Sequence, residues 1–309
     1  MKKWLCLLIT LTAGVCAAEG QVALPRASLT LEAADDAGSP VAGARASIRA
    51  QDKDKSLQRV GKTDEAGKFA AELPSFGYLY YSVGSDNFYS AWGEYQFERG
   101  GMSGDPVKWG DGRWSPWNPT VRVVLKRKGE PIPMNAKRIS IVTLPTRDKP
   151  VGFDFVAGDW VGPYGKGKTP DIFFSATGSV EKSDYVLTWT FPNKGDGIIV
   201  YPYEGGARSE LRSPTQAPAD GYSSQVTVDA EGRPIGQSGD ARPLSFAFRV
   251  RTLLDDAGKV VSAHYGKIYP EAYKAVYYFN PIPNSRTLEY DNKRNLFTDL
   301  KSFEQINDP

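Results

Sequence analysis

One loop of the chain matches the pattern of a phosphate-binding loop. Residues 162–169 read Gly-Pro-Tyr-Gly-Lys-Gly-Lys-Thr, which fits G-x-x-x-x-G-K-T. Such a loop needs a helix directly after it, because the backbone N–H groups of that helix bind the phosphate. Pro170 and Asp171 follow instead, and the apolar run 172–174 predicts a strand. We therefore expect a chance match in a glycine-rich loop, with no nucleotide cofactor.

Carboxylates and a single histidine are the remaining acid–base candidates. Asp154 and Asp159 each lie beside an aromatic residue. They are the first pair to test for glycoside hydrolysis, which needs two carboxyl groups about 5–9.5 Å apart. His264 alone cannot form a multi-histidine metal site, and no nucleophile-elbow serine motif accompanies it. We assign no catalytic residue, metal ligand or cofactor, and we keep a glycan-processing hydrolase as the alternative to a non-enzymatic protein.

Arginines could form an anion-binding site in the second half of the chain. Two of them are two residues apart in an expected strand, which places them on the same face. Two more precede that strand, and all four could gather around one anion. The alternative is that they are solvated or ion-paired, for example with Glu210. The candidates are Arg249, Arg251, Arg208 and Arg212.

Tryptophans are concentrated around the glycine-rich segment 98–119 and are candidate ligand-binding residues. The members are Trp109, Trp114 and Trp117 inside the segment and Trp92 just before it. The rings could pack internally, or they could form a platform for sugar rings or for another protein chain. Calcium held by Asp105, Asp111 and glycine carbonyls is a third interpretation, although no EF-hand spacing is present. We expect Trp114 and Trp117 to be buried and Trp109 to be the most exposed.

Strands must position all of these residues, because the chain shows period-two patterns and little helical periodicity. Apolar residues alternate with polar ones in residues 28–32, 79–83 and 185–191. The turn 255–259 between alternating runs gives the best hairpin signal. Short helices are expected only near residues 270–275 and 295–305. The fold class is therefore all-β, with two domains at residues 27–127 and 130–303, the second a larger sandwich or barrel-like domain.

Two motifs in the first domain carry a family resemblance. Residues 36–44 read Asp-Ala-Gly-Ser-Pro-Val-Ala-Gly-Ala, and residues 63–69 read Thr-Asp-Glu-Ala-Gly-Lys-Phe. They resemble the carboxypeptidase regulatory-like domain, in which Gly38 and Gly67 suit tight turns and Phe69 enters the core. The resemblance implies a seven-stranded, transthyretin-like sandwich without catalytic residues, which serves as a spacer or folding module.

The second domain resembles uncharacterised exported proteins of Verrucomicrobia-type bacteria. The stretches that carry this resemblance are residues 151–154, 209–214 and 248–252. The resemblance implies export and one continuous domain, and it implies no activity.

The N-terminal segment predicts export. Two lysines precede an apolar stretch at residues 4–15, and small residues at 16–18 suit cleavage after Ala18. The alternatives are an uncleaved helix and a lipid anchor on Cys16. Both cysteines lie in this segment, so the mature chain would lack thiols and disulfides. It would also keep 36 residues of each charge sign, which argues against nucleic-acid binding.

These patterns together predict a cell-envelope protein in the periplasm or on the surface of a Gram-negative bacterium. No segment of the mature chain has the ~20 apolar residues of a transmembrane helix. The expected role is a non-enzymatic scaffold or binding module, whose partner is a glycan or another envelope protein.

Overall fold

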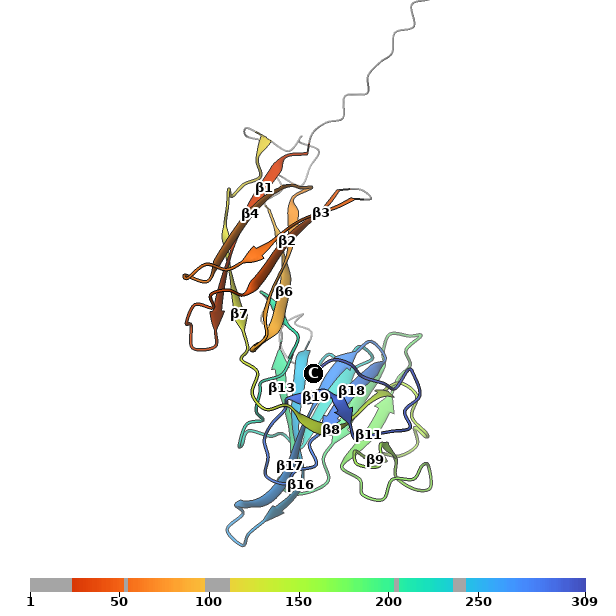
Figure 1. Cartoon of the computed structure of the whole chain (residues 1–309). Coiled ribbons are helices and arrows are strands. Elements are labelled where there is room, and N and C mark those ends of the chain that lie inside the picture. The colour runs from red at the N-terminus through yellow and green to blue at the C-terminus, as the bar shows by residue number, and fades with distance from the viewer. Residues whose placement is uncertain (1–23, 53–54, 98–111, 203–205, 236–242) are drawn as a thin grey trace, which may run out of the picture.

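The computed structural model describes residues 24–52, 55–97, 112–202, 206–235 and 243–309. All regular secondary structure of these residues is β, with 19 strands in four sheets. Figure 1 shows two lobes placed end to end, with the first seven strands in one lobe and most of the others in the second. No helix within these ranges is long and apolar enough to cross a membrane. The all-β prediction is confirmed, whereas the targeting segment at residues 1–18, with Cys16, lies outside the described residues.

The first lobe is a sandwich built from the first seven strands. A three-stranded sheet has the order β4-β1-β7, and β6-β5-β2-β3 belong to the facing five-stranded sheet. Buried apolar side chains from both sheets form one core, in agreement with the alternation in the sequence. The strands are β1 (Arg26–Asp35), β2 (Arg45–Asp52), β3 (Lys55–Lys62), β4 (Lys68–Pro74), β5 (Tyr78–Ser85), β6 (Phe88–Gln96) and β7 (Thr120–Leu125).

The two motifs of the first lobe form tight turns, as predicted. Gly38 and Gly67 have positive φ angles of 84° and 74°, a conformation that residues with a Cβ atom rarely adopt. Each glycine follows an aspartate whose Oδ1 accepts two backbone N–H groups of the turn. Asp35 does so at 3.0 and 2.9 Å, and Asp64 at 3.0 and 2.7 Å. These local bonds connect β1 to the following segment and β3 to β4.

The second lobe is a sandwich of two larger sheets. Their orders are β10-β9-β11-β12-β15 and β13-β16-β17-β18-β8-β19. Aromatic side chains of both sheets fill the space between them, including Phe155 stacked on Phe248 with centroids 4.6 Å apart. The strands are β8 (Ile132–Ser140), β9 (Val151–Asp154), β10 (Asp159–Trp160), β11 (Ile172–Thr177), β12 (Val186–Thr190), β13 (Gly197–Pro202), β15 (Gln225–Asp229), β16 (Pro243–Leu254), β17 (Val260–Glu271), β18 (Lys274–Phe279) and β19 (Tyr290–Asn295).

The two predicted short helices are wrong. Residues 270–275 form the turn of the β17–β18 hairpin and the strand ends beside it, where Glu271 and Lys274 are backbone partners in the register. Residues 296–305 form turns that are bonded to β8, because Arg138 donates to the carbonyl oxygens of Phe303 and Gln305 at 3.2 and 3.1 Å. These carbonyls therefore bond to a distant strand, and tertiary contacts override a weak local helical preference.

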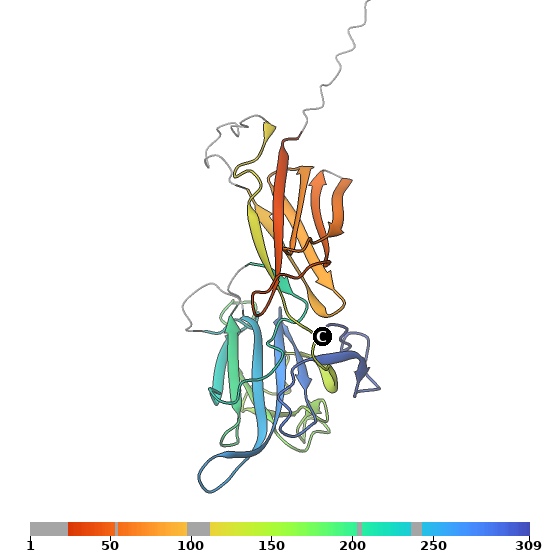
Figure 2. The same ribbon diagram turned by 60° about the vertical axis from the view of Figure 1, so that its left-hand side comes forward.

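A short strand of the second lobe joins a sheet of the first lobe. β14 (Arg208–Ser209) pairs antiparallel with β6, which makes it the outer strand of the five-stranded sheet. Glu210 continues the pairing, since its backbone N donates to Ser90 O at 2.8 Å. Figure 2 shows this segment reaching from the second lobe toward the first. The two sandwiches therefore share backbone hydrogen bonds outside the linker at residues 126–131.

Buried polar contacts reinforce this junction. Lys126 Nζ donates to the carbonyl oxygens of Leu211 and Ser213 at 2.9 and 2.8 Å. Glu289, which is 4% exposed, accepts on Oε1 from the Tyr89 hydroxyl at 3.0 Å and from the Gly129 backbone N at 2.8 Å. The junction thus holds both ends of the linker, and the predicted domain boundary at residues 127–130 stays a prediction.

Candidate functional site

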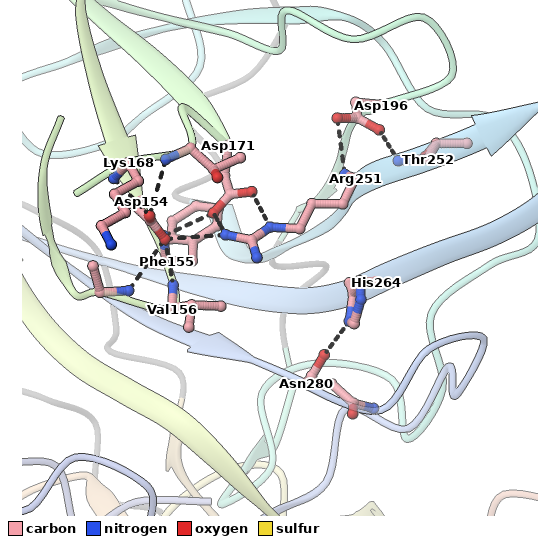
Figure 3. Close-up of polar contacts among 12 residues, drawn as sticks. Asp154, Phe155, Val156, Lys168, Asp171, Asp196, Arg251, Thr252, His264 and Asn280 are labelled. Atoms are coloured by element: carbon pink, nitrogen blue, oxygen red, sulfur yellow. Dashed lines mark hydrogen bonds and ion pairs between the residues drawn. The ribbon is translucent and has the colours of Figure 1, made fainter.

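Three charged side chains meet between the two sheets of the second lobe, and a fourth binds the backbone beside them (Figure 3). They are Asp154, Asp171, Asp196 and Arg251. The three aspartates are at most 5% exposed. Asp154 ends β9 and Asp171 directly precedes β11, both strands of the five-stranded sheet, whereas Arg251 lies on β16 of the facing sheet. Buried charges of this kind must be paired, and such clusters often mark functional sites.

An unusual backbone conformation directs Arg251 into the cluster. Its φ is +55°, in the left-handed region, and the register between β16 and β17 shifts between Val250 and Leu253. Phe248 and Val250 point into the core, so a regular strand would point the next side chain away from it. The bulge instead brings the guanidinium to the facing sheet, which is a known use of β-bulges.

Arg251 forms a forked ion pair. Its Nε lies 2.7 Å from Asp171 Oδ1, and its Nη2 lies 2.9 Å from Asp171 Oδ2 and 3.0 Å from Asp154 Oδ1. Burial raises the pKa of Asp171, and the hydrogen bond and charge of Arg251 oppose that rise. The bidentate geometry suits a guanidinium and would not be reproduced by lysine.

Asp196 holds the bulge in place. Its Oδ2 accepts from the Arg251 backbone N at 3.1 Å, and its Oδ1 accepts from the Thr252 backbone N at 2.9 Å. Burial raises the pKa of Asp196, and the hydrogen bonds from Thr252 and Arg251 counter this effect. A residue in the left-handed region costs of order 1–3 kcal/mol, so this carboxylate compensates for local strain.

The glycine-rich loop at residues 162–169 is organised by two aspartates. Asp154 Oδ2 accepts from the backbone N atoms of Lys168 and Thr169 at 3.0 and 3.1 Å. Asp159 Oδ2 accepts from the Lys166 backbone N at 2.8 Å. The N–H groups that a phosphate would need are therefore bound to carboxylates. A strand follows at Ile172, as predicted, so this loop lacks the geometry of a nucleotide-binding loop.

Asp154 and Asp159 both accept hydrogen bonds from backbone N–H groups. Burial pushes the pKa of Asp154 upward, but hydrogen bonds from backbone N–H groups outweigh burial and lower its pKa. Its Oδ1 also accepts from the backbone N atoms of Val156 and Ala157 at 3.0 and 3.1 Å. A general acid needs a raised pKa and a proton to donate, so Asp154 does not suit that role, and both of its oxygens are engaged by the loop and the following turn.

His264 lies at the edge of the cluster (Figure 3). Its ring stacks on Phe279 with centroids 5.3 Å apart, and the Arg251 guanidinium lies 5.4 Å from the same phenyl ring. Nδ1 is 3.2 Å from the Asn280 carbonyl oxygen. The bonds of the cluster connect the two sheets and shape a loop, so the role of the cluster is structural.

The sequence analysis did not identify Asp171 and Asp196 as site residues. The one signal that could have indicated them is their position just before a predicted strand.

The four predicted anion-binding arginines have separate neighbours. Arg249 is 8% exposed and donates to the Gly195 and Ala219 carbonyl oxygens at 2.7 and 2.9 Å. Arg212 lies 4.0 Å from the centroid of the Tyr269 ring, in the junction. Arg208 is exposed on β14. We predicted that Arg249 and Arg251 lie on the same face of the strand. They do not, because the positive φ of Arg251 interrupts the alternation of side chains along β16.

The tryptophans of segment 98–119 differ from one another. Trp114 is 4% exposed, as predicted, and its Nε1 donates to Ser75 O at 2.9 Å. The prediction that Trp117 is buried is wrong, because it is 40% exposed and stacks with Arg113 at 4.7 Å. Asn118 anchors this end of the loop instead, accepting on Oδ1 from two hydroxyls of β1 at 3.0 and 2.9 Å. Trp109 lies outside the described residues, as do Asp105 and Asp111.

Replacing Trp114 by alanine is expected to lower the free energy of unfolding by about 3–5 kcal/mol, the range for large buried aromatics. The Trp117→Ala variant should change it by no more than ~0.5 kcal/mol, because exposed residues contribute little. Urea denaturation of both variants tests the pair. Equal losses in the two variants would contradict the assignment.

Trp92 belongs to an aromatic face on the first lobe, in which Tyr78 and Tyr80 are half-buried. It is 43% exposed and lies opposite Ser82 on β5 and Arg208 on β14. Tyr78 and Tyr80 lie on the same side of β5, with ring centroids 5.7 Å apart. We call Tyr78, Tyr80 and Trp92 the aromatic face; its polar neighbours are Ser47, Arg49, Gln58, Ser82 and Glu94. The alternation in residues 78–83 could have identified the two tyrosines.

Comparisons with known proteins give no family. No protein-family model matches the chain, and no curated protein matches its sequence. The resemblances to the carboxypeptidase regulatory-like domain and to Verrucomicrobia-type proteins therefore stay predictions.

Several solved structures are similar to the chain. The major pilin subunit BcpA of Bacillus cereus is 11% identical, with 82% of this chain and 68% of that chain covered and a TM-score of 0.24. A DUF3823 family protein from Parabacteroides merdae is 10% identical over 87% of this chain and 100% of that chain, with a TM-score of 0.21. A candidate carbohydrate-binding protein from Bacteroides uniformis is 9% identical over 84% and 99%, with a TM-score of 0.21. With TM-scores this low, these likenesses say nothing about what this chain binds.

Proposed function

We propose that the chain is an exported, non-enzymatic scaffold protein of the bacterial cell envelope that binds a glycan on its aromatic face. The observation that carries this proposal is the exposed ring of Trp92, which lies beside Tyr80 on an open sheet. Large aromatic rings usually lie at least partly buried, so an exposed indole on the same face as two half-buried tyrosines calls for a partner. The exported location rests on the N-terminal pattern.

The chemistry of the aromatic face fits a neutral sugar. The apolar face of a pyranose ring can stack on an indole or phenol, while its hydroxyls need hydrogen-bonding groups around the ring. Ser47, Ser82 and Glu94 supply such groups in adjacent register positions. Arg49 lies 5.3 Å from the centroid of Tyr80 and adds a donor at the margin. The shared register keeps these groups at fixed spacing.

The junction supports the scaffold role. β14 pairs with β6 and Tyr89 donates to Glu289 outside the linker, and Lys126 and Gly129 bind the linker itself to the second lobe. A linker alone would leave the two sandwiches free to reorient. A rigid two-lobed body suits a spacer that presents a binding face at a fixed distance from another envelope component.

The rival hypothesis is a glycan hydrolase. Its first two candidate residues, Asp154 and Asp159, instead bind the backbone of the glycine-rich loop.

A glycan array with the purified chain, read beside a panel of glycosidase substrates, tests this function. We expect binding of neutral glycans without hydrolysis. Replacing Trp92 by alanine should weaken binding at least about tenfold, which corresponds to ~1.4 kcal/mol. Trp117→Ala is the matched control, because Trp117 is exposed to a similar fraction, 40% against 43%, outside the aromatic face. Loss of binding in the control but not in Trp92→Ala would assign the site to the loop, and hydrolysis would overturn the non-enzymatic role.

A further inference from the structure

The second lobe contains a cavity that is separate from the aromatic face. Its volume is about 280 Å³, near the lower end of the ~300–1,000 Å³ typical of small-molecule sites. It lies between β8, the start of β18, the β9–β10 turn and the turn at residues 303–304. Its lining includes Lys137, Arg138, Asp159, Trp160, Lys274 and Phe303.

Hydrogen bonds connect the walls of the cavity to one another. Lys137 Nζ donates to Gly158 O at 2.9 Å and lies 3.0 Å from Glu304 Oε1, so it joins the β9–β10 turn to the C-terminal turn. Arg138 binds the same C-terminal turn through its backbone N, which donates to Glu304 O at 3.0 Å. Because these bonds already order the walls of the cavity, the protein loses little conformational entropy when a ligand binds there.

Aromatic rings form one side of the cavity. Trp160 makes edge-to-face contacts with Phe153 and Phe174, with centroids 5.2 and 5.5 Å away. Two such contacts fix the orientation of the indole, which remains partly exposed. Phe303, 60% exposed, lies on the C-terminal turn at the opening. The rings therefore offer a rigid apolar surface to a flat or ring-shaped group.

Among the described residues, two cations of the lining are ion-paired and Lys274 is not, while the Asp159 carboxylate is bound by backbone N–H groups. Lys137 pairs with Glu304, and Arg138 pairs with Glu271 at 2.9 Å. Asp159 binds the backbone N atoms of Trp160 and Lys166. Lys274 is exposed and takes part in no ion pair within the described ranges of the chain. The cavity therefore offers one ammonium group for an anionic substituent.

We propose that this cavity binds a uronic acid, a sugar ring that carries a carboxylate. The ring packs against Trp160, and the carboxylate pairs with Lys274. The sugar hydroxyls meet the hydroxyls of Ser140 and Thr143 on the lining. This site differs from the aromatic face in both its lobe and the charge of its ligand, so it does not depend on the proposed function.

Calorimetric titration of the whole chain tests the proposal with D-galacturonic acid, digalacturonic acid and neutral D-galactose. We expect both uronates to bind at least about tenfold more tightly than galactose, with a preference that weakens as salt rises. Binding of only the disaccharide would identify a polysaccharide as the source, and binding of the monomer would identify the single sugar as sufficient. Absence of uronate binding at millimolar concentration would overturn the proposal.

Variants on exposed positions keep the test independent of folding. Lys274→Gln should remove the preference for uronates, and Phe303→Ala should weaken all binding. Lys259→Gln, an exposed lysine on the distant β16–β17 turn, is the matched control and should change nothing. Equal affinity of Lys274→Gln and the parent chain would contradict the ion pair. Trp92→Ala should leave uronate binding intact, which separates this site from the aromatic face.

Discussion

Replacing Arg251 by methionine is expected to lower the free energy of unfolding by about 3–5 kcal/mol, the cost of removing one partner from a buried ion pair. Asp171 is fully buried and would keep its charge without the guanidinium that lies 2.7 and 2.9 Å away. Urea denaturation at pH 7 measures the loss. Arg233→Met is the matched control, because its pair with Asp229 lies at the surface and should contribute at most ~1 kcal/mol.

The loss caused by Arg251→Met should depend on pH. Burial already raises the pKa of Asp171, and removing Arg251 takes away the interactions that oppose this rise. The folded variant then binds a proton more readily than the unfolded chain, so its stability falls as pH rises through the folded pKa. The difference from the parent chain should therefore be smaller at pH 5 than at pH 7. A second change, Asp171→Asn, should recover part of the loss at pH 7. A pH-independent loss without such recovery would contradict the ion-pair account.

Replacing Lys267 by methionine is expected to stabilise the chain by about 1–3 kcal/mol at pH 7, the cost of leaving a buried donor without a hydrogen bond. Lys267 is fully buried, and its Nζ has no hydrogen-bond partner among the described residues. The rings of Tyr269 and Tyr278 lie 4.9 and 4.6 Å from it. Methionine fills a similar volume without an amine to desolvate, so it fits the same place between the rings.

The pKa of Lys267 gives this gain a definite pH dependence. Burial lowers its pKa well below the ordinary value, the positive charges of Arg212 and Lys126 act in the same direction, and Glu289 opposes them. Between the folded pKa and the ordinary one, the unfolded chain binds one more proton. The stability of the parent chain therefore rises with pH by about 1.4 kcal/mol per unit. The advantage of Lys267→Met should narrow from pH 7 to pH 9.

Lys126→Met is the control for this prediction. Lys126 is a second lysine of the junction whose pKa burial lowers, but its amine donates to the carbonyl oxygens of Leu211 and Ser213. Its removal leaves two buried acceptors unsatisfied, so we expect a loss of stability where Lys267→Met gives a gain. Thermal unfolding of both variants at pH 7 compares them. Destabilisation by Lys267→Met would show that the buried amine has a partner.

Local patterns in the sequence predicted several strands and turns of this protein. The alternation in residues 185–191 predicted β12, and the turn 255–259 predicted the β16–β17 hairpin. Gly38 and Gly67 predicted turns that the structure contains. These features depend on neighbours a few residues apart, so side-chain periodicity and turn chemistry report them directly.

Tertiary structure alone decided the arrangement of the candidate sites. Period-two reasoning placed Arg251 beside Arg249, but a bulge stabilised by Asp196, 55 residues earlier in the chain, redirects it. β14 is only two residues long, and it pairs with β6, a strand of the other lobe far earlier in the chain. Trp117 is exposed because Asn118 takes over the anchoring of its loop. Each of these outcomes depends on contacts between distant segments, which residue periodicity does not encode.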